Sequence, residues 1–246
     1  MAQAPLQALI FDVDGTLADT EHAHLAAFNT AFAQAGFDWH WDLPLYTQLL
    51  EVSGGKERLL HYWRTVQPDL KDIDGNGLRD SIDQLHALKT AAYEAAVLTG
   101  AVPLRPGVLK LIEAAHRDGL TLAIATTTSP VNIAALLRAA IGAEWARYFA
   151  VVEDASTAPR KKPDPQVYQQ TLQRLGLPAA ACVAVEDSAN GLRAATAAGL
   201  ATLITPNPFT AHHDFSGALR VLPSLLDVGV AHLRVWHAEA AQASRH

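Results

Sequence analysis

The stretch FDVDGTLADTEHAH, residues 11–24, places two carboxylates one residue apart directly after an apolar run. Asp12 and Asp14 repel each other at this spacing, so the pair requires either solvent or a cation. Gly15 permits a tight turn that keeps the two acids together and exposes backbone N–H groups to an anion. A strand that ends in this way predicts a ligand crevice at the carboxyl edge of a parallel sheet; a solvated turn is the simpler alternative.

Short apolar runs alternate with helical patterns over most of the remaining chain, which is typical of buried parallel strands. Because right-handed crossovers place the helices on both faces of such a sheet, we predict an α/β fold with a doubly wound parallel sheet. The expected strands cover residues 8–12, 120–125, 148–152, 182–186 and 201–204. The expected helices cover residues 107–118, 131–140, 165–175 and 190–198.

One region breaks this alternation, because helical patterns alone follow one another between about residues 20 and 99. Pro103 and Pro106 then mark the return to the sheet, since a residue before proline disfavours the helical conformation. We therefore predict an α/β core formed by residues 1–19 and 100–246, with a helical insert at residues 20–99. The tail HAEAAQASRH, residues 237–246, is expected to be a frayed terminal helix.

Composition narrows the classes of partner. The chain has 246 residues, half of them hydrophobic, which suits one large domain or a main domain with an insert. Its 19 basic and 25 acidic residues are scattered, so we expect neither a nucleic-acid nor a membrane partner. The single Cys182 and the missing signal segment predict a cytoplasmic protein, with an organelle stroma left open. We expect a monomer, although the residues do not fix the oligomeric state.

A second apolar run, in VAVEDSANG (residues 183–191), also ends in paired acids, Glu186 and Asp187. If the two strands are neighbours, four carboxylates converge at one edge of the sheet, which requires a compensating cation. Ligands that are all oxygens point to Mg²⁺, a hard ion that readily shares a phosphate. Acids that end two strands by chance are the alternative.

Two further stretches are suited to phosphate. In AIATTTSP, residues 123–130, Thr126 and its two neighbours precede a helix start, where hydroxyls and N–H groups cradle phosphate oxygens; a simple N-cap is the alternative. In RKKPDP, residues 160–165, Lys162 stands before a proline and a helix start. At the same edge its ammonium would hold a phosphoryl group and keep Asp12 ionised, whereas a solvated basic loop is the alternative.

FDVDGTL, ATT, KKP and VEDS follow one another in the order of the four motifs of the haloacid dehalogenase-like hydrolases, which the chain resembles from about residue 8 to residue 227. Within that family it is similar to the CbbY-like sugar-phosphate phosphatases, relatives of β-phosphoglucomutase and phosphoglycolate phosphatase. The stretches that carry this likeness are DVDGTLADTEHAH, GGKER, LRPGV, ATTTS, KKP and VEDSANGLRAA. The resemblance implies a Rossmann-like core and an inserted helical cap that selects the substrate.

The resemblance also implies roles for individual residues. Asp12 would be the nucleophile that forms an aspartyl-phosphate, and Asp14 would protonate the leaving alkoxide and later deprotonate water. The implied Mg²⁺ ligands are Asp12, the backbone carbonyl of Asp14 and Asp187, with Glu186 in support. The groups implied to stabilise the phosphoryl group are Thr126 and Lys162.

Substrate binding is expected to involve the insert. Glu21 and His24 are three apart on one helical face, and His24 matches a histidine of β-phosphoglucomutase-like relatives; a structural histidine is the alternative. In GGKER, Gly54 and Gly55 allow close approach of the backbone to a ligand. Lys56 and Arg58 of the same stretch could grip a second phosphate, unless they form a solvated helix start. The remaining expected substrate contacts are Thr127, Thr128 and Ser188.

The expected reaction is Mg²⁺-dependent hydrolysis of a small sugar bisphosphate, and the resemblance makes xylulose-1,5-bisphosphate the leading substrate. A phosphomutase would use the same two aspartates. Thr16 argues weakly against it, because β-phosphoglucomutases tend to have an aliphatic residue at this position. A non-catalytic interaction protein is disfavoured because every motif is intact. Residues 72–83, DIDGNGLRDSID, imitate a calcium-binding loop but lack its glutamate at the last position, so we expect a helix start. We expect His212 and His213 to be loop residues.

Overall fold

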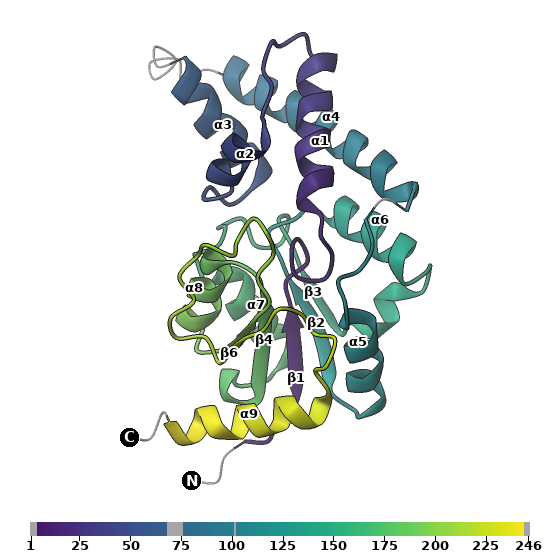
Figure 1. The fold of residues 1–246 in the computed structure, drawn as a ribbon, viewed down its shortest axis with the longest axis vertical. Coiled ribbons are helices and arrows are strands. Elements are labelled where there is room, and N and C mark those ends of the chain that lie inside the picture. The colour runs from purple at the N-terminus through teal and green to yellow at the C-terminus, as the bar shows by residue number, and fades with distance from the viewer. Residues whose placement is uncertain (1–3, 68–75, 101, 244–246) are drawn as a thin grey trace.

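The protein is described by a computed structural model over residues 4–67, 76–100 and 102–243. Its strands form one parallel sheet in the order β3-β2-β1-β4-β5-β6 (Figure 1). The predicted α/β fold is therefore confirmed. The strands are β1 (Ala8–Phe11), β2 (Thr121–Ala125), β3 (Val151–Glu153), β4 (Cys182–Glu186), β5 (Ala201–Ile204) and β6 (Arg220–Val221).

The third strand was predicted too early in the chain. The apolar run predicted as a strand over residues 148–152 begins on the last residue of a 3₁₀ turn, Trp145–Tyr148, and β3 starts three residues later. Hydrogen bonding to β2 begins only at Ala150, whose N–H donates to the carbonyl of Leu122 at 2.8 Å. An apolar run does not mark by itself where strand pairing begins, because the preceding turn is mostly apolar as well.

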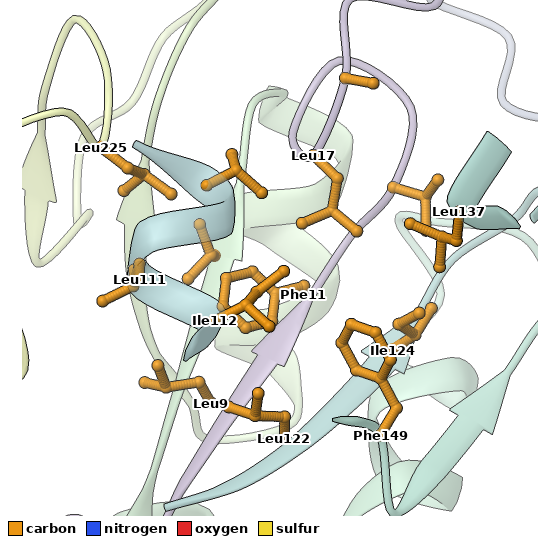
Figure 2. Close-up of a cluster of buried hydrophobic side chains, with 14 of the residues drawn as sticks. Leu9, Phe11, Leu17, Leu111, Ile112, Leu122, Ile124, Leu137, Phe149 and Leu225 are labelled. Atoms are coloured by element: carbon orange, nitrogen blue, oxygen red, sulfur yellow. The ribbon is translucent and has the colours of Figure 1, made fainter. Parts of the chain in front are cut away.

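Alternate residues of each strand face opposite layers of helices. Leu9 and Phe11 point toward α5 (Val108–Arg117), α6 (Pro130–Ala140) and α9 (Val230–Ala243), in the cluster shown in Figure 2. Ala8 and Ile10 point toward α7 (Gln166–Leu175) and α8 (Ala189–Ala197). Because both faces are covered, the strands are apolar on both sides, and only their ends are available for polar groups.

Four helices stand above the carboxyl ends of the strands, between β1 and β2 in the chain (Figure 1). These helices and the segment between α1 and α2 form a separate aromatic core that includes Phe28, Phe32, Trp41 and Tyr46. This arrangement supports the predicted helical insert, whose limits at residues 20 and 99 stay a prediction. Across the described residues, no helix has the length and apolar character needed to cross a membrane. The four helices are α1 (Glu21–Gln34), α2 (Leu43–Leu49), α3 (Gly55–Val66) and α4 (Asn76–Leu98).

The two segments that join the insert to the core run side by side. Ala18 and Leu104 form an antiparallel bridge, and the buried side chain of Arg105 extends from the second segment. Its guanidinium donates to the carbonyl of Gly15 and lies 3.2 Å from the carboxylate of Asp19 in the first segment. One side chain thus joins both connections to the turn that follows Asp12.

Candidate active site

The acids at the ends of β1 and β4 meet at the edge of the sheet. The strand order reverses between these two strands, and a doubly wound sheet opens its ligand crevice at such a point. Asp12, Glu186 and Asp187 are buried, and each offers one carboxylate oxygen within 4.8 Å of the other two. The structure therefore brings together three of the four acids that the sequence placed at this edge.

Lys162 is the cation that contacts this cluster. Its Nζ lies 2.6 Å from Asp12 Oδ1 and 2.6 Å from Glu186 Oε1, and it also donates to the carbonyl of Ala125 at 2.9 Å. Burial lowers the pKa of Lys162, but the two carboxylates outweigh burial and raise it above its ordinary value. Lys162 therefore stays charged at neutral pH, and we expect this charge to offset part of the repulsion.

Within the described part of the chain, Lys162 is the one cation that forms an ion pair with any of these three carboxylates. Burial raises the pKa of Asp12 to about 7, against the opposing effect of Lys162. Burial, together with Asp12 and Glu186, raises the pKa of Asp187 well above its ordinary value. Three buried carboxylates facing one ammonium, with oxygen ligands only, form a donor set that fits a hard divalent cation.

Hydrogen bonds from neutral side chains hold the carboxylates of Glu186 and Asp187 in place. The Tyr168 hydroxyl donates to Glu186 Oε1 at 2.5 Å, and the side-chain amide of Asn207 donates to Asp187 Oδ2 at 2.7 Å. A Cβ at Gly191 would lie only 1.9 Å from Glu186 Oε2, so the glutamate fits only because α8 has a glycine there. We therefore expect these acids to reorient little when a ligand binds.

Asp14 lies beside this cluster and contacts the insert. Its Oδ1 is 3.0 Å from His24 Nε2, and its Oδ2 accepts a hydrogen bond from the Thr128 hydroxyl. The ammonium of Lys89, on α4, lies 2.8 Å from His24 Nδ1 and has only protons to offer, so Nε2 carries the ring proton and donates to Asp14. Burial raises the pKa of Asp14, but His24 outweighs burial and lowers it below its ordinary value.

The helix starts show which of the predicted polar residues cap a helix. The Thr126 and Thr128 hydroxyls do not cap α6: Thr126 accepts from the N–H of Thr128, and Thr128 donates to Asp14. Ser129 caps α6 by accepting from the N–H of Asn132, so Thr126 and the two threonines after it precede the cap rather than forming it. Ser188, which we expected at the substrate, caps α8 by accepting from the N–H of Gly191 at 3.1 Å. The predicted N-cap alternative is therefore wrong for the three threonines, and Ser188 is itself a cap.

On the insert side, the two basic residues of GGKER differ. Lys56 is half exposed and lies 2.7 Å from Asp83, which is also exposed. Arg58 is buried, and its guanidinium donates to the carbonyls of Leu49 and Val52. Lys56 is thus free to turn toward a ligand, whereas Arg58 also holds α3 to the turn before it. In the stretch that imitates a calcium loop, residues 72–75 lie outside the described part of the chain.

One pocket between sheet edge and insert contains every predicted site residue. Its opposite walls are the carboxylate cluster of the core and the start of α3. The predicted residues that line it are Asp12, Asp14, Glu21, His24, Gly54, Gly55, Lys56, Arg58, Thr126, Thr127, Thr128, Lys162, Glu186, Asp187 and Ser188.

Other lining residues were not predicted: His86, Lys89, Lys161, Asn190 and His213. Burial and neighbouring cations lower the pKa of His86 to about 4, so its ring is neutral. A Cβ at Gly55 would lie 2.9 Å from His86 Nε2, so Gly55 makes room for this histidine as well as for a ligand. The sequence contains a signal for Lys89. It is four residues from both Leu85 and Tyr93, so it lies on the apolar face of its helix, where a lysine is buried with a partner or a ligand.

Comparisons with known proteins agree with this geometry. The family model described as haloacid dehalogenase-like hydrolase matches residues 6–199. The plasmid-encoded protein CbbY of Cupriavidus necator is 55% identical over 94% of this chain and 97% of its own length. The crystal structure of CbbY from Rhodobacter sphaeroides with phosphate has a TM-score of 0.84 and 42% identity, covering 93% of this chain and 99% of that chain.

Another crystal structure of CbbY from Rhodobacter sphaeroides contains an aspartate-to-asparagine mutant in complex with xylulose-(1,5)bisphosphate. Its TM-score of 0.84, its identity and its coverage are the same. The match extends over nearly the whole of this chain, insert included. These relatives, the intact motifs and the buried acid cluster agree on a phosphatase rather than a non-catalytic protein. The chain belongs to the haloacid dehalogenase-like hydrolases and, within them, to the CbbY-like phosphatases.

Proposed function

We propose that the protein is a Mg²⁺-dependent phosphatase that hydrolyses a small sugar bisphosphate, with xylulose-1,5-bisphosphate as the leading substrate. The observation that carries the proposal is a pocket with a buried nucleophile at one end and basic side chains at the other. The complex of the related CbbY mutant with xylulose-(1,5)bisphosphate supports this choice of substrate.

In the first half of the reaction, an Asp12 oxygen attacks phosphorus while the bond from phosphorus to the sugar oxygen breaks. Because its lowered pKa leaves Asp14 ionised at rest, Asp14 first takes up a proton from solvent. It then gives that proton to the departing alkoxide, and an aspartyl-phosphate remains. In the second half, Asp14 takes a proton from water, which attacks the phosphorus and releases inorganic phosphate and free Asp12. In the structure both Asp14 oxygens face donors, His24 and Thr128, so Asp14 must leave one of these partners to carry the transferred proton.

Electrostatics would carry much of the rate enhancement. Lys162 contacts the nucleophile, so its ammonium would hold the transferred phosphoryl group together with Thr126. Asp12, the Asp14 backbone carbonyl and Asp187 would hold Mg²⁺, with Glu186 in support. When bound, the ion would cancel the repulsion between the carboxylate nucleophile and a phosphate dianion.

The insert side of the pocket is lined by Lys56, Arg58 and Lys89, here called the basic wall, which favours a second phosphate on the substrate. Lys56 is half exposed, so its side chain has room to turn toward a ligand. Lys89 is a buried ammonium whose pKa burial lowers to about 8. Lys161 adds a half-buried ammonium from the core side of the same pocket. A monophosphate would use the acid end alone and bring no second phosphate to these cations, so we expect bisphosphates to bind more tightly.

The test is phosphate release from ketose bisphosphates, sugar monophosphates and phosphoglycolate, each with Mg²⁺ and with EDTA. We expect metal-dependent release that is fastest from xylulose-1,5-bisphosphate and absent in Asp12→Asn. Equal rates on all compounds would contradict the bisphosphate assignment. Isomerised sugar phosphates in place of free phosphate would identify a phosphomutase instead.

A further inference from the structure

The insert touches the core at a second place, away from the two connecting segments. The turn at residues 50–54, between α2 and α3, lies against the start of α8 (Figure 1). The side-chain Nδ2 of Asn190 donates to the carbonyl of Glu51 at 3.1 Å and to the hydroxyl of Ser53 at 3.1 Å. Arg193 donates to Asn190 Oδ1 at 2.5 Å, so both amide protons of Asn190 are directed toward the insert.

His213 forms a second link beside the first. The N–H of Ala189 donates to its Nδ1 at 3.2 Å, so the ring proton of the neutral imidazole is on Nε2, 3.4 Å from the carboxylate of Glu51. His212 lies 4.0 Å from the same carboxylate. Glu51 and the two histidines resemble a set of metal ligands, but Nε2 of His213 has no free lone pair for a cation. The arrangement is therefore a hydrogen-bonded bridge.

Both links start from the residues that follow the acid cluster. Asp187 is followed by the capping Ser188, then by Ala189 and Asn190, which contact His213 and the insert. On the insert side of these links, the turn ends at Gly54, the N-cap of α3, and Lys56 lies in the first turn of that helix. The distance between the reacting phosphate and the basic wall thus depends on these links.

We propose that Asn190 and His213 are positioning residues that seat the turn at residues 50–54 over the pocket and so set the reach from nucleophile to Lys56. This inference rests on the proposed function, because it concerns how the far end of a bisphosphate is recognised. It extends the site to residues that need not touch the substrate. Loss of the links releases the turn and leaves the acid cluster intact.

The experiment compares Asn190→Asp with the wild type. The substitution keeps the size of the side chain and its contact with Arg193 but removes both donors to the insert. Thr196→Ala, an exposed position on the same helix, is the matched control. KM and kcat are measured with Mg²⁺ for xylulose-1,5-bisphosphate and for p-nitrophenyl phosphate, and hydrogen exchange is measured over residues 50–58 without substrate. His213→Asn is the second variant.

We expect Asn190→Asp to raise KM for the bisphosphate roughly 10-fold, with kcat within about twofold and p-nitrophenyl phosphate kinetics unchanged. Hydrogen exchange in the turn should become roughly 10-fold faster, and His213→Asn should act in the same direction. Unchanged KM and exchange would overturn the inference, as would an equal loss of kcat on both substrates. If even the wild type ignores the bisphosphate but cleaves p-nitrophenyl phosphate, the proposed substrate fails, and the exchange result alone decides on the links.

Discussion

The two ends of the pocket are built differently. At the core end, Asp12, Lys162 and Glu186 are buried and joined by contacts of 2.6 Å. At the insert end, Lys56 and Asp83 form an ion pair in which both side chains are more than half exposed, at 51% and 61%. A buried, mutually bound cluster holds reacting atoms in one geometry, whereas an exposed pair contributes little stability and can exchange partners. Chemistry and substrate choice should therefore respond separately to mutation.

The strongest test of the core end is Asp12→Asn. Without a nucleophile, turnover should fall by at least about 10³-fold, because no other residue can form the aspartyl-phosphate. Phosphate release under substrate saturation measures this loss, and circular dichroism checks that the fold is kept. Asp118→Asn, at an exposed position after α5, serves as the control and should keep full activity. Residual turnover above a few per cent would show that Asp12 is not the nucleophile.

Lys89 contacts His24, the insert residue that binds Asp14. Because burial lowers the pKa of Lys89 to about 8, substrate binding should depend on pH in this range. As pH rises through 8 the ammonium loses its charge, so KM for a bisphosphate should rise. Lys89→Met should lower kcat/KM roughly 10- to 100-fold at pH 7 and remove this pH dependence. KM measured from pH 6.5 to 9.5 in both proteins tests this. A variant that keeps the alkaline rise in KM would assign the titration to another group.

Lys56→Ala tests the insert end alone. We expect KM for bisphosphates to rise about 10-fold and monophosphates to be little affected, because one charge-assisted hydrogen bond to the far phosphate is lost. The thermal midpoint should change little, since the pair with Asp83 is exposed. Lys110→Ala, another exposed lysine, is the control. An equal effect on both classes of substrate would place Lys56 outside the far-phosphate site.

The smallest expected effect is on stability, from Asp187→Asn. The pKa of Asp187 is raised above its unfolded value, so the folded state binds more protons and loses stability as pH rises through that raised pKa. In EDTA, the variant should therefore melt about 3 °C or more above the wild type at pH 7.5, and the difference should shrink toward pH 4.5. Adding Mg²⁺ should stabilise the wild type more than the variant. A variant that melts lower at pH 7.5 would show that this carboxylate is already compensated.

Much of the core end could be predicted from the sequence, because strand ends in a parallel sheet converge whatever the helices do. Asp12, Glu186 and Asp187 each follow or end an apolar run, so their meeting required only that β1 and β4 be neighbours. Lys162 was less predictable, because its place before a proline and a helix start also fits a solvated basic loop. Element limits were less secure, as β3 shows.

The insert end was harder to predict, because its partners come from segments that only tertiary packing brings together. Lys89 and His24 are 65 residues apart, and Asn190 and Glu51 are 139 apart. Nothing local in His213 indicates that its ring bridges a helix start and a carboxylate. Arg58 shows the converse: a basic residue in a glycine-rich stretch suggested phosphate, while two of its donors serve backbone carbonyls.

The side chain of Arg105 has a consequence for how the insert could be exchanged between proteins of this fold. It ties the outgoing and incoming connections to the turn after Asp12, so both attachment points are fixed to the core. A different insert could be joined at these points without moving that turn. It would still have to supply a partner for Asp14, because His24 comes from the insert.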